Sequence, residues 1–122
     1  MKKLLLILSV AFCLTANAQY TKLFDFNNTN GADPRSYLFY DGTYLYGTTQ
    51  SGGALTGGTV FKIKPDGSAY QNLYNFQASP FSEHSPSTSL IFDGTYLYST
   101  TGNLNSSNKG VIFKIKPDGT GY

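Results

Sequence analysis

The stretch DGTYLYGTT begins at Asp41, and DGTYLYSTT begins at Asp93, 52 positions later. The likeness extends on both sides, because residues 34–70 align with residues 86–122 at the same shift and more than half of the paired letters are identical. The heptapeptide FKIKPDG occurs unchanged in both copies. A period of about 50 residues is typical of propeller blades and related repeat arrays. The sequence therefore predicts two copies of one structural unit.

Each copy is predicted to form four antiparallel strands. In the first copy these strands are YLFYD from Tyr37, TYLYGTT from Thr43, VFKIK from Val60 and YQNLYNF from Tyr70. Apolar and polar residues alternate in FKIK, as they do in a half-buried strand. Asp-Gly and Pro-Asp-Gly separate neighbouring strands, because these residues suit the backbone angles of tight turns. The Gly- and Asn-rich segments 50–58 and 102–110 are expected to be exposed loops, since their letters differ while their length does not.

A further partial copy precedes the first unit. The segment YTKLFDFN from Tyr20 matches YQNLYNFQ from Tyr70, which is the last strand of that unit. The predicted fold is therefore all-β, with two repeated four-stranded units that resemble propeller blades. The sequence favours part of a larger propeller, and the alternative is that the orphan strand completes the second sheet and the units self-associate with other copies. The expected organisation is a signal peptide (1–18), the orphan strand and its connection (19–35), a first unit (36–87) and an incomplete second unit (88–122).

The N-terminus has the pattern of a secretory signal peptide. Lys2 and Lys3 precede the apolar run Leu4–Leu14, which is short for a membrane span. A small-x-small site comes next, and cleavage is expected between Ala18 and Gln19. The competing interpretation is an N-terminal membrane anchor. We expect an exported product without a membrane span, located outside the cell, at its surface or in the periplasm.

The composition of the exported part excludes several classes of function. The chain has 9 basic and 7 acidic residues, and Lys2 and Lys3 leave with the signal peptide. The remainder is neutral, so nucleic acid is not an expected partner. Cys13, the only cysteine, lies in the same segment. Neither a disulfide nor a thiol site is therefore expected after cleavage.

The repeated motif resembles that of a known family. The pattern D-G-x-x-L-Y-G-T-T, a Gly-rich loop, G-T-V-F-K-I-x-P-D-G and a trailing tyrosine is carried by Asp41–Thr49, Gly57–Gly67 and Tyr70. It resembles the GloVer-type tandem repeat of secreted bacterial proteins, although the second copy has Ser99 in place of glycine and Val111-Ile112 in place of Thr-Val. The resemblance covers nearly all of the exported part and implies blade-like repeats. It supplies no catalytic residues.

The ionisable residues do not predict an enzyme site. Four aspartates precede glycine in predicted turns, and turn formation accounts for them. Asp25, Asp33 and Glu83 remain. Of these, Glu83 is the one that neither a turn nor a strand accounts for, and it has no evident partner for glycosidase chemistry. His84, the only histidine, lies in a polar loop without the spacing of zinc ligands. An Asn-rich segment at 25–31 departs from the calcium-loop pattern. No catalytic residue, metal or cofactor is therefore predicted.

Tyrosines offer the remaining candidate site. Tyr44, Tyr46, Tyr96 and Tyr98 lie on equivalent strands, where core packing is the expected role of such rings. Tyr46 and Tyr98 are the candidates for contact with a ligand. The four lysines of the two FKIK segments are expected on a solvated strand face.

The function that the sequence favours is a secreted non-enzymatic module for binding or structural scaffolding. A glycan or an extracellular protein is the expected partner, an expectation that rests on analogy with the fold. The alternative is a fragment of a propeller-type secreted carbohydrate-active enzyme whose acids lie in other blades.

Overall fold

The computed structural model describes residues 19–79, 84–102 and 109–122, and the predicted signal peptide lies outside this part. The described residues form seven strands and no helix, which confirms the predicted all-β fold. Accordingly, they contain no helix long and apolar enough to cross a bilayer. The strands are β1 (Phe39–Tyr40), β2 (Leu45–Thr49), β3 (Thr56–Ile63), β4 (Gln71–Gln77), β5 (Ile91–Phe92), β6 (Leu97–Thr100) and β7 (Ile112–Ile115).

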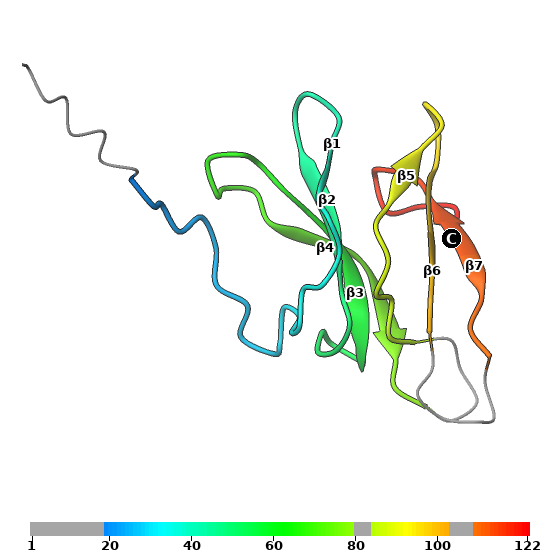
Figure 1. Cartoon of the computed structure of the whole chain (residues 1–122). Coiled ribbons are helices and arrows are strands. Elements are labelled where there is room, and N and C mark those ends of the chain that lie inside the picture. The colour runs from blue at the N-terminus through cyan, green and yellow to red at the C-terminus, as the bar shows by residue number, and fades with distance from the viewer. Residues whose placement is uncertain (1–18, 80–83, 103–108) are drawn as a thin grey trace, which may run out of the picture.

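The strands form two antiparallel sheets, which Figure 1 shows side by side. Sheet 1 has the order β1-β2-β3-β4, and sheet 2 has the order β5-β6-β7. Their registers repeat, because Tyr46 pairs with Lys62 in sheet 1 and Tyr98 pairs with Lys114 in sheet 2. The two predicted units are thus two sheets of the same design. Sheet 2 ends at β7, at the position that β3 occupies in sheet 1.

The repeated Asp-Gly turn closes the first hairpin of each sheet. The Asp41 carboxylate accepts the amide N–H groups of Thr43 (2.7 Å) and Tyr44 (2.8 Å), and Asp93 does the same in the second copy. Gly42 has a φ of +98°, a left-handed conformation that glycine adopts without steric cost. The turn that the sequence predicts is therefore formed by an aspartate side chain and a glycine acting together.

One strand is longer than the sequence predicts. β3 begins at Thr56 rather than at Val60, so it includes part of the predicted Gly-rich loop. Gly57 and Gly58 are buried there, and a Cβ atom at Gly57 would lie 2.5 Å from the carbonyl oxygen of Phe76 on β4. These glycines permit a close backbone approach, which a loop composition does not reveal. Register shifts between β3 and β4 accompany the extension.

A hydrophobic core lies between the two sheets. Sheet 1 contributes Tyr46 and Val60 from one face, and sheet 2 contributes Leu97 and Ile115 from the opposing face, each no more than 2% exposed. The alternation in FKIK is confirmed. Phe61 and Ile63 of sheet 1 are buried on the face opposite this core, where they lie beside the N-terminal segment. The core therefore uses opposite faces of the two sheets, and each sheet keeps one outer face.

The N-terminal segment Tyr20–Phe26 forms a third layer. It lies beside the outer face of sheet 1, on the side away from sheet 2 (Figure 1). It belongs to no strand pair in the described part of the chain. The order of layers is therefore the N-terminal segment, sheet 1 and sheet 2.

Candidate functional site

The N-terminal segment contacts sheet 1 in the same way as β4 contacts sheet 2. The ring of Phe24 stacks on Tyr70, with centroids 4.1 Å apart and an interplanar angle of 10°. At the equivalent positions Tyr74 stacks on Tyr122, with values of 3.9 Å and 14°. The segment therefore takes the place of a β4 strand in front of sheet 1.

A second pair of rings repeats the same geometry. Phe26 meets Phe61 edge to face at 5.3 Å and 67°, and Phe76 meets Phe113 at 5.3 Å and 66°. Edge-to-face contacts at this separation are favourable aromatic arrangements. The chain therefore contains two equivalent aromatic interfaces. One joins sheet 1 to sheet 2, and the other joins the N-terminal segment to sheet 1.

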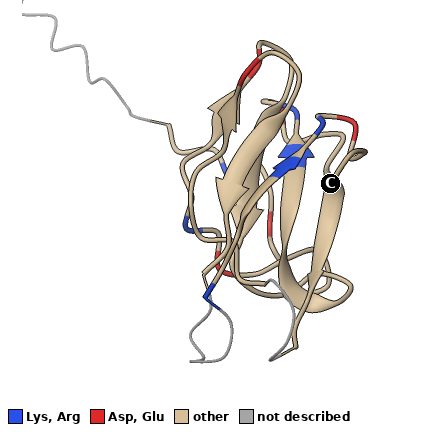
Figure 2. Ribbon diagram, turned by 90° about the vertical axis from the view of Figure 1, so that its right-hand side faces the viewer, with Lys and Arg blue, Asp and Glu red and all other residues tan. Residues whose placement is uncertain are grey.

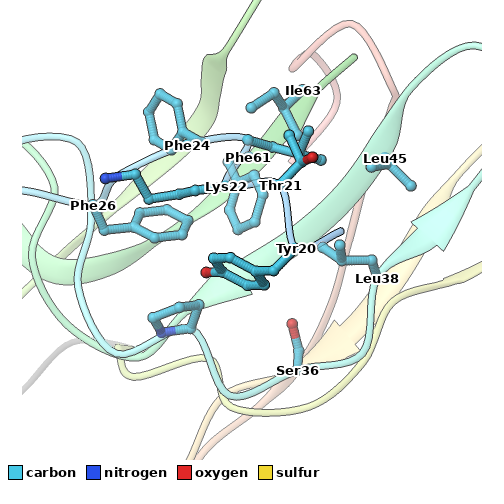
Figure 3. A pocket seen from close by; sticks show the side chains of 12 residues that line it. Tyr20, Thr21, Lys22, Phe24, Phe26, Ser36, Leu38, Leu45, Phe61 and Ile63 are labelled. Atoms are coloured by element: carbon cyan, nitrogen blue, oxygen red, sulfur yellow. The ribbon is translucent and has the colours of Figure 1, made fainter. Parts of the chain in front are cut away.

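A pocket of about 340 Å³ lies on the outer face of sheet 1, between this sheet and the N-terminal segment. Figure 3 shows its lining, with the N-terminal segment on one side and Leu38, Leu45 and Ile63 from sheet 1 on the other. Leu38 is 53% exposed, whereas its equivalent between the sheets, Leu90, is 4% exposed. The pocket therefore lies where the side chains of another sheet would complete a core.

The outer face of sheet 2 is the counterpart of this pocket. It carries a shallow hollow of about 190 Å³. Ile91 is 69% exposed and Ile112 is 81% exposed, although each belongs to a strand. Val60, the equivalent of Ile112, is completely buried against sheet 2. The hollow is lined by Thr88, Ser89, Ile91, Tyr98, Ser99, Thr100 and Ile112.

The two tyrosines predicted as ligand contacts lie in different surroundings. Tyr46 is 2% exposed and packs in the core between the sheets, whereas Tyr98 is half-buried on the outer face of sheet 2. Each hydroxyl donates a hydrogen bond to its turn aspartate, Tyr46 to Asp41 (2.9 Å) and Tyr98 to Asp93 (2.7 Å). Ligand contact stays a prediction for both, and only the ring of Tyr98 lies beside a surface hollow.

These hydrogen bonds shift the pKa of both partners. Burial and the bond to Asp41 raise the pKa of Tyr46 well above its usual value, and the bond to Asp93 raises the pKa of Tyr98. Hydrogen bonds from Tyr96, Tyr98 and Thr95 lower the pKa of Asp93. Each aspartate is therefore stabilised as a carboxylate that accepts hydrogen bonds, which is a structural role and a poor starting point for a general acid.

The other turn aspartates are held in the same way. Asp66 accepts hydrogen bonds from the side chain and the amide of Ser68, and these bonds lower its pKa. Thr120 makes the same two bonds to Asp118 and lowers its pKa. All four Asp-Gly aspartates thus accept hydrogen bonds within their own turns.

Lys62 departs from the expected solvated stripe, whereas Lys114 is exposed. Lys62 lies 4.9 Å from the ring centroid of Tyr44 and donates a hydrogen bond across the sheets to the carbonyl oxygen of Pro117 (3.2 Å). Lys114, its equivalent, lies over Tyr96 at 4.3 Å. The sequence did not reveal the contact with Pro117, because it joins residues 55 positions apart. Lys62 is therefore part of the contact between the two sheets.

The remaining polar candidates form no reactive group among the described residues. His84 shares a hydrogen bond with its neighbour Ser85 (2.8 Å), and Glu83 lies outside the described part. In the Asn-rich segment, Asn27 and Asn30 bond to each other through backbone and side chain. Within residues 19–79, 84–102 and 109–122, no three His, Cys, Asp or Glu residues are placed to hold a metal ion.

Comparison with known proteins identifies a family. A family model described as the Gloeobacter/Verrucomicrobia repeat matches residues 9–122. This match confirms the resemblance that the repeated motif indicates. No curated protein and no solved structure matches the chain.

Proposed function

The chain belongs to the Gloeobacter/Verrucomicrobia repeat family, and from that premise we propose that it is an exported, non-enzymatic module for binding or scaffolding. Its two sheets act in this proposal as blades of a propeller-like array. The three strands of sheet 2 have the order and register of the first three strands of sheet 1, and the second sheet packs on the first face to face.

One observation carries the proposal, namely the exposure of apolar side chains on both outer faces. Ile91 and Ile112 are exposed on sheet 2, and Leu38 and the N-terminal Leu23 are about half exposed at the pocket of sheet 1. Exposed apolar residues that gather on one surface mark interaction sites in soluble proteins. The proposed activity is therefore the burial of these faces against a partner.

A protein partner fits these faces better than a glycan. The exposed residues at the hollow of sheet 2 include two isoleucines, and aliphatic side chains pack well against protein surfaces. A sugar site combines an aromatic ring with polar groups that orient the hydroxyls. At this hollow such groups already bond within the chain, because the Asp93 carboxylate accepts hydrogen bonds in its own hairpin and the Thr88 hydroxyl bonds to those of Ser99 and Thr100. The faces therefore favour protein contact.

Chemical cross-linking in the cells that produce the chain tests this proposal. Wild type is compared with Ile112→Lys, which places a charge on the outer face of sheet 2, and with Leu55→Lys, which changes an aliphatic residue 50% exposed in a loop. We expect cross-links to protein that are lost in Ile112→Lys and kept in Leu55→Lys.

Three results would overturn the proposal. Cross-links that are identical in all three proteins would show that the outer face of sheet 2 makes no partner contact. Hydrolysis of a polysaccharide by the purified chain would show an enzyme instead. A glycan-array signal that Ile112→Lys retains would replace the protein partner by a sugar.

A further inference from the structure

We propose that the partner of these faces is a second copy of the chain, bound head to tail. The trailing face, which we define as Ile91, Tyr96, Tyr98 and Ile112, packs in this arrangement on the leading face of the next copy, defined as Leu38, Leu45 and Ile63. The Tyr20–Phe26 segment of that copy then pairs with β7 as a fourth strand. This inference rests on the proposed function and names its partner.

The trailing face has the composition of a surface that the chain already buries. Its residues are the repeat equivalents of Phe39, Tyr44, Tyr46 and Val60, which pack against sheet 2 in the core. Both tyrosines are identical in the two copies, and the other two positions remain apolar. Since the same face of sheet 1 is buried by a sheet, the trailing face fits a sheet of the same kind.

The leading face resembles the surface that covers sheet 1 in the core. Its three residues are the equivalents of Leu90, Leu97 and Ile115, with the same residue type at each position. Those three belong to the core cluster that contains Tyr46 and Val60, and they are at most 4% exposed. One molecule thus carries both halves of an interface whose completed form is visible between its own sheets.

The N-terminal segment is placed to extend sheet 2 of another copy, because β7 is an edge strand of the described sheet. It sits beside the leading face as β4 sits beside sheet 2, through the stacked ring of Phe24 and the edge-to-face ring of Phe26. When a second copy binds, this position places its segment along the free side of β7. The β3–β4 register, in which Thr59 pairs with Asn75 and Val60 with Tyr74, then predicts two pairs: Val111 with Asp25, and Ile112 with Phe24, of the second copy.

The hydrogen bond between the two sheets also has equivalents on the trailing and leading faces. Lys62 donates to the carbonyl oxygen of Pro117 in the completed interface. The equivalent donor on the trailing face is Lys114, and the equivalent acceptor on the leading copy is the carbonyl oxygen of Pro65. No charged residue in the described part of the chain lines the hollow of sheet 2, and Figure 2, which is turned toward the side of sheet 2, shows Lys and Arg on a strand there, in keeping with Lys114 on β7. Packing and one lysine contact therefore agree on a single arrangement.

The contact joins different faces, so it is heterologous and repeats from copy to copy. A heterologous contact produces a ring when the rotation closes and a filament when it does not. Propellers have about four to eight blades, which corresponds to rings of about two to four chains with two sheets each.

Native mass spectrometry of the full chain gives the first test, with the denatured mass of the same sample as the protomer reference. We expect a closed multiple of the protomer mass for wild type and for Leu55→Lys. Ile112→Lys and Leu38→Lys, which change the trailing and the leading face, should each shift the sample to protomer. A wild-type sample that is protomeric at all concentrations would overturn the proposal, as would a multiple that neither face variant dissociates.

Disulfide trapping tests the register, in a background where Cys13 is replaced by serine. Paired residues on neighbouring antiparallel strands have Cα atoms about 4.5–5.5 Å apart, within the range that a disulfide spans. Val111→Cys mixed with Asp25→Cys should form a disulfide dimer, and neither variant should do so alone. Leu55→Cys in place of Asp25→Cys is the matched control and should give no product.

These outcomes separate the inference from the proposed function. A protomer without a trapped dimer overturns self-assembly. If the cellular cross-links still depend on Ile112 in that case, the binding function stands and its partner is another protein. If they do not, both proposals fall.

Discussion

Val60 and Ile112 hold equivalent positions in the two sheets, yet Val60 is completely buried and Ile112 is 81% exposed. Both lie next to the repeated Phe-Lys-Ile sequence, on the face that carries the paired tyrosines. The difference arises from the packing on that face, because sheet 2 covers Val60 and no described residue covers Ile112 in the same way. One local structure thus has two environments.

This pair of residues gives the first prediction. Val60→Ala should lower the free energy of unfolding by about 2 kcal/mol, since it removes buried methyl groups from the core. Ile112→Ala should change it by less than about 0.5 kcal/mol, as surface substitutions usually do. Urea unfolding measures both, at a protein concentration where the chain is protomeric. A comparable loss in the two variants would contradict the assignment of Ile112 to an uncovered face.

The phenylalanines of the two FKIK segments give the second prediction. Phe61 is 3% exposed and Phe113 is 7% exposed, and each meets one phenylalanine at 5.3 Å. Phe61→Ala and Phe113→Ala should therefore each cost about 3–5 kcal/mol. Denaturant titration of the two proteins checks this. A small cost at Phe61 alone would show that the N-terminal segment does not pack on sheet 1 in solution.

Alkaline pH should weaken the contact between the N-terminal segment and sheet 1. Burial raises the pKa of Tyr70 to about 12, and an unfolded tyrosine titrates near 10. Because the folded pKa is the higher one, the stability that this group contributes is complete below pH 10 and is lost as the pH rises to about 12. Unfolding free energies measured across this range should fall.

The matched variant for this pH effect is Tyr70→Phe. It keeps the ring that stacks on Phe24 and removes the ionisable hydroxyl. The fall in stability with pH should be smaller in Tyr70→Phe than in wild type. An identical pH profile would exclude Tyr70 as the titrating group.

Acid should also lower the stability of the fold, through the turn aspartates. Hydrogen bonds from Tyr96, Tyr98 and Thr95 lower the pKa of Asp93 below that of an unfolded aspartate, which is about 3.9. The stability that this carboxylate contributes is therefore present above pH 4 and is lost as the pH falls through the folded pKa. Asp93→Asn should flatten the acid limb of a stability profile followed by tyrosine fluorescence, and an unchanged limb would assign the loss to other carboxylates.

Much of this structure was predictable from local patterns. The alternation in FKIK and the Asp-Gly turns depend on neighbouring residues, and both features appear where the sequence places them. The start of β3 at Thr56 was missed because Gly57 and Gly58 are typical of a loop, whereas their lack of side chains permits close approach to β4.

The site was less predictable, for a physical reason. Tyr46 and Tyr98 have identical neighbours from Asp41 and Asp93 onward for six residues, so local sequence cannot distinguish a buried ring from a half-buried one. Their burial depends on whether another sheet packs on that face. The contact of Lys62 with Pro117 has the same origin, because it exists only once two units are stacked.

Amide hydrogen exchange at several protein concentrations tests the central claim most directly, since it reports on the two faces separately. If a second copy covers them, the amides of β7 and those of Tyr20–Phe26 should exchange rapidly in dilute protein and gain protection over one common concentration range. Ile112→Lys should abolish that gain, and Leu55→Lys should not. Exchange at β7 that does not depend on concentration, in a sample whose β2 and β3 amides are protected, would contradict the claim that these faces bind each other.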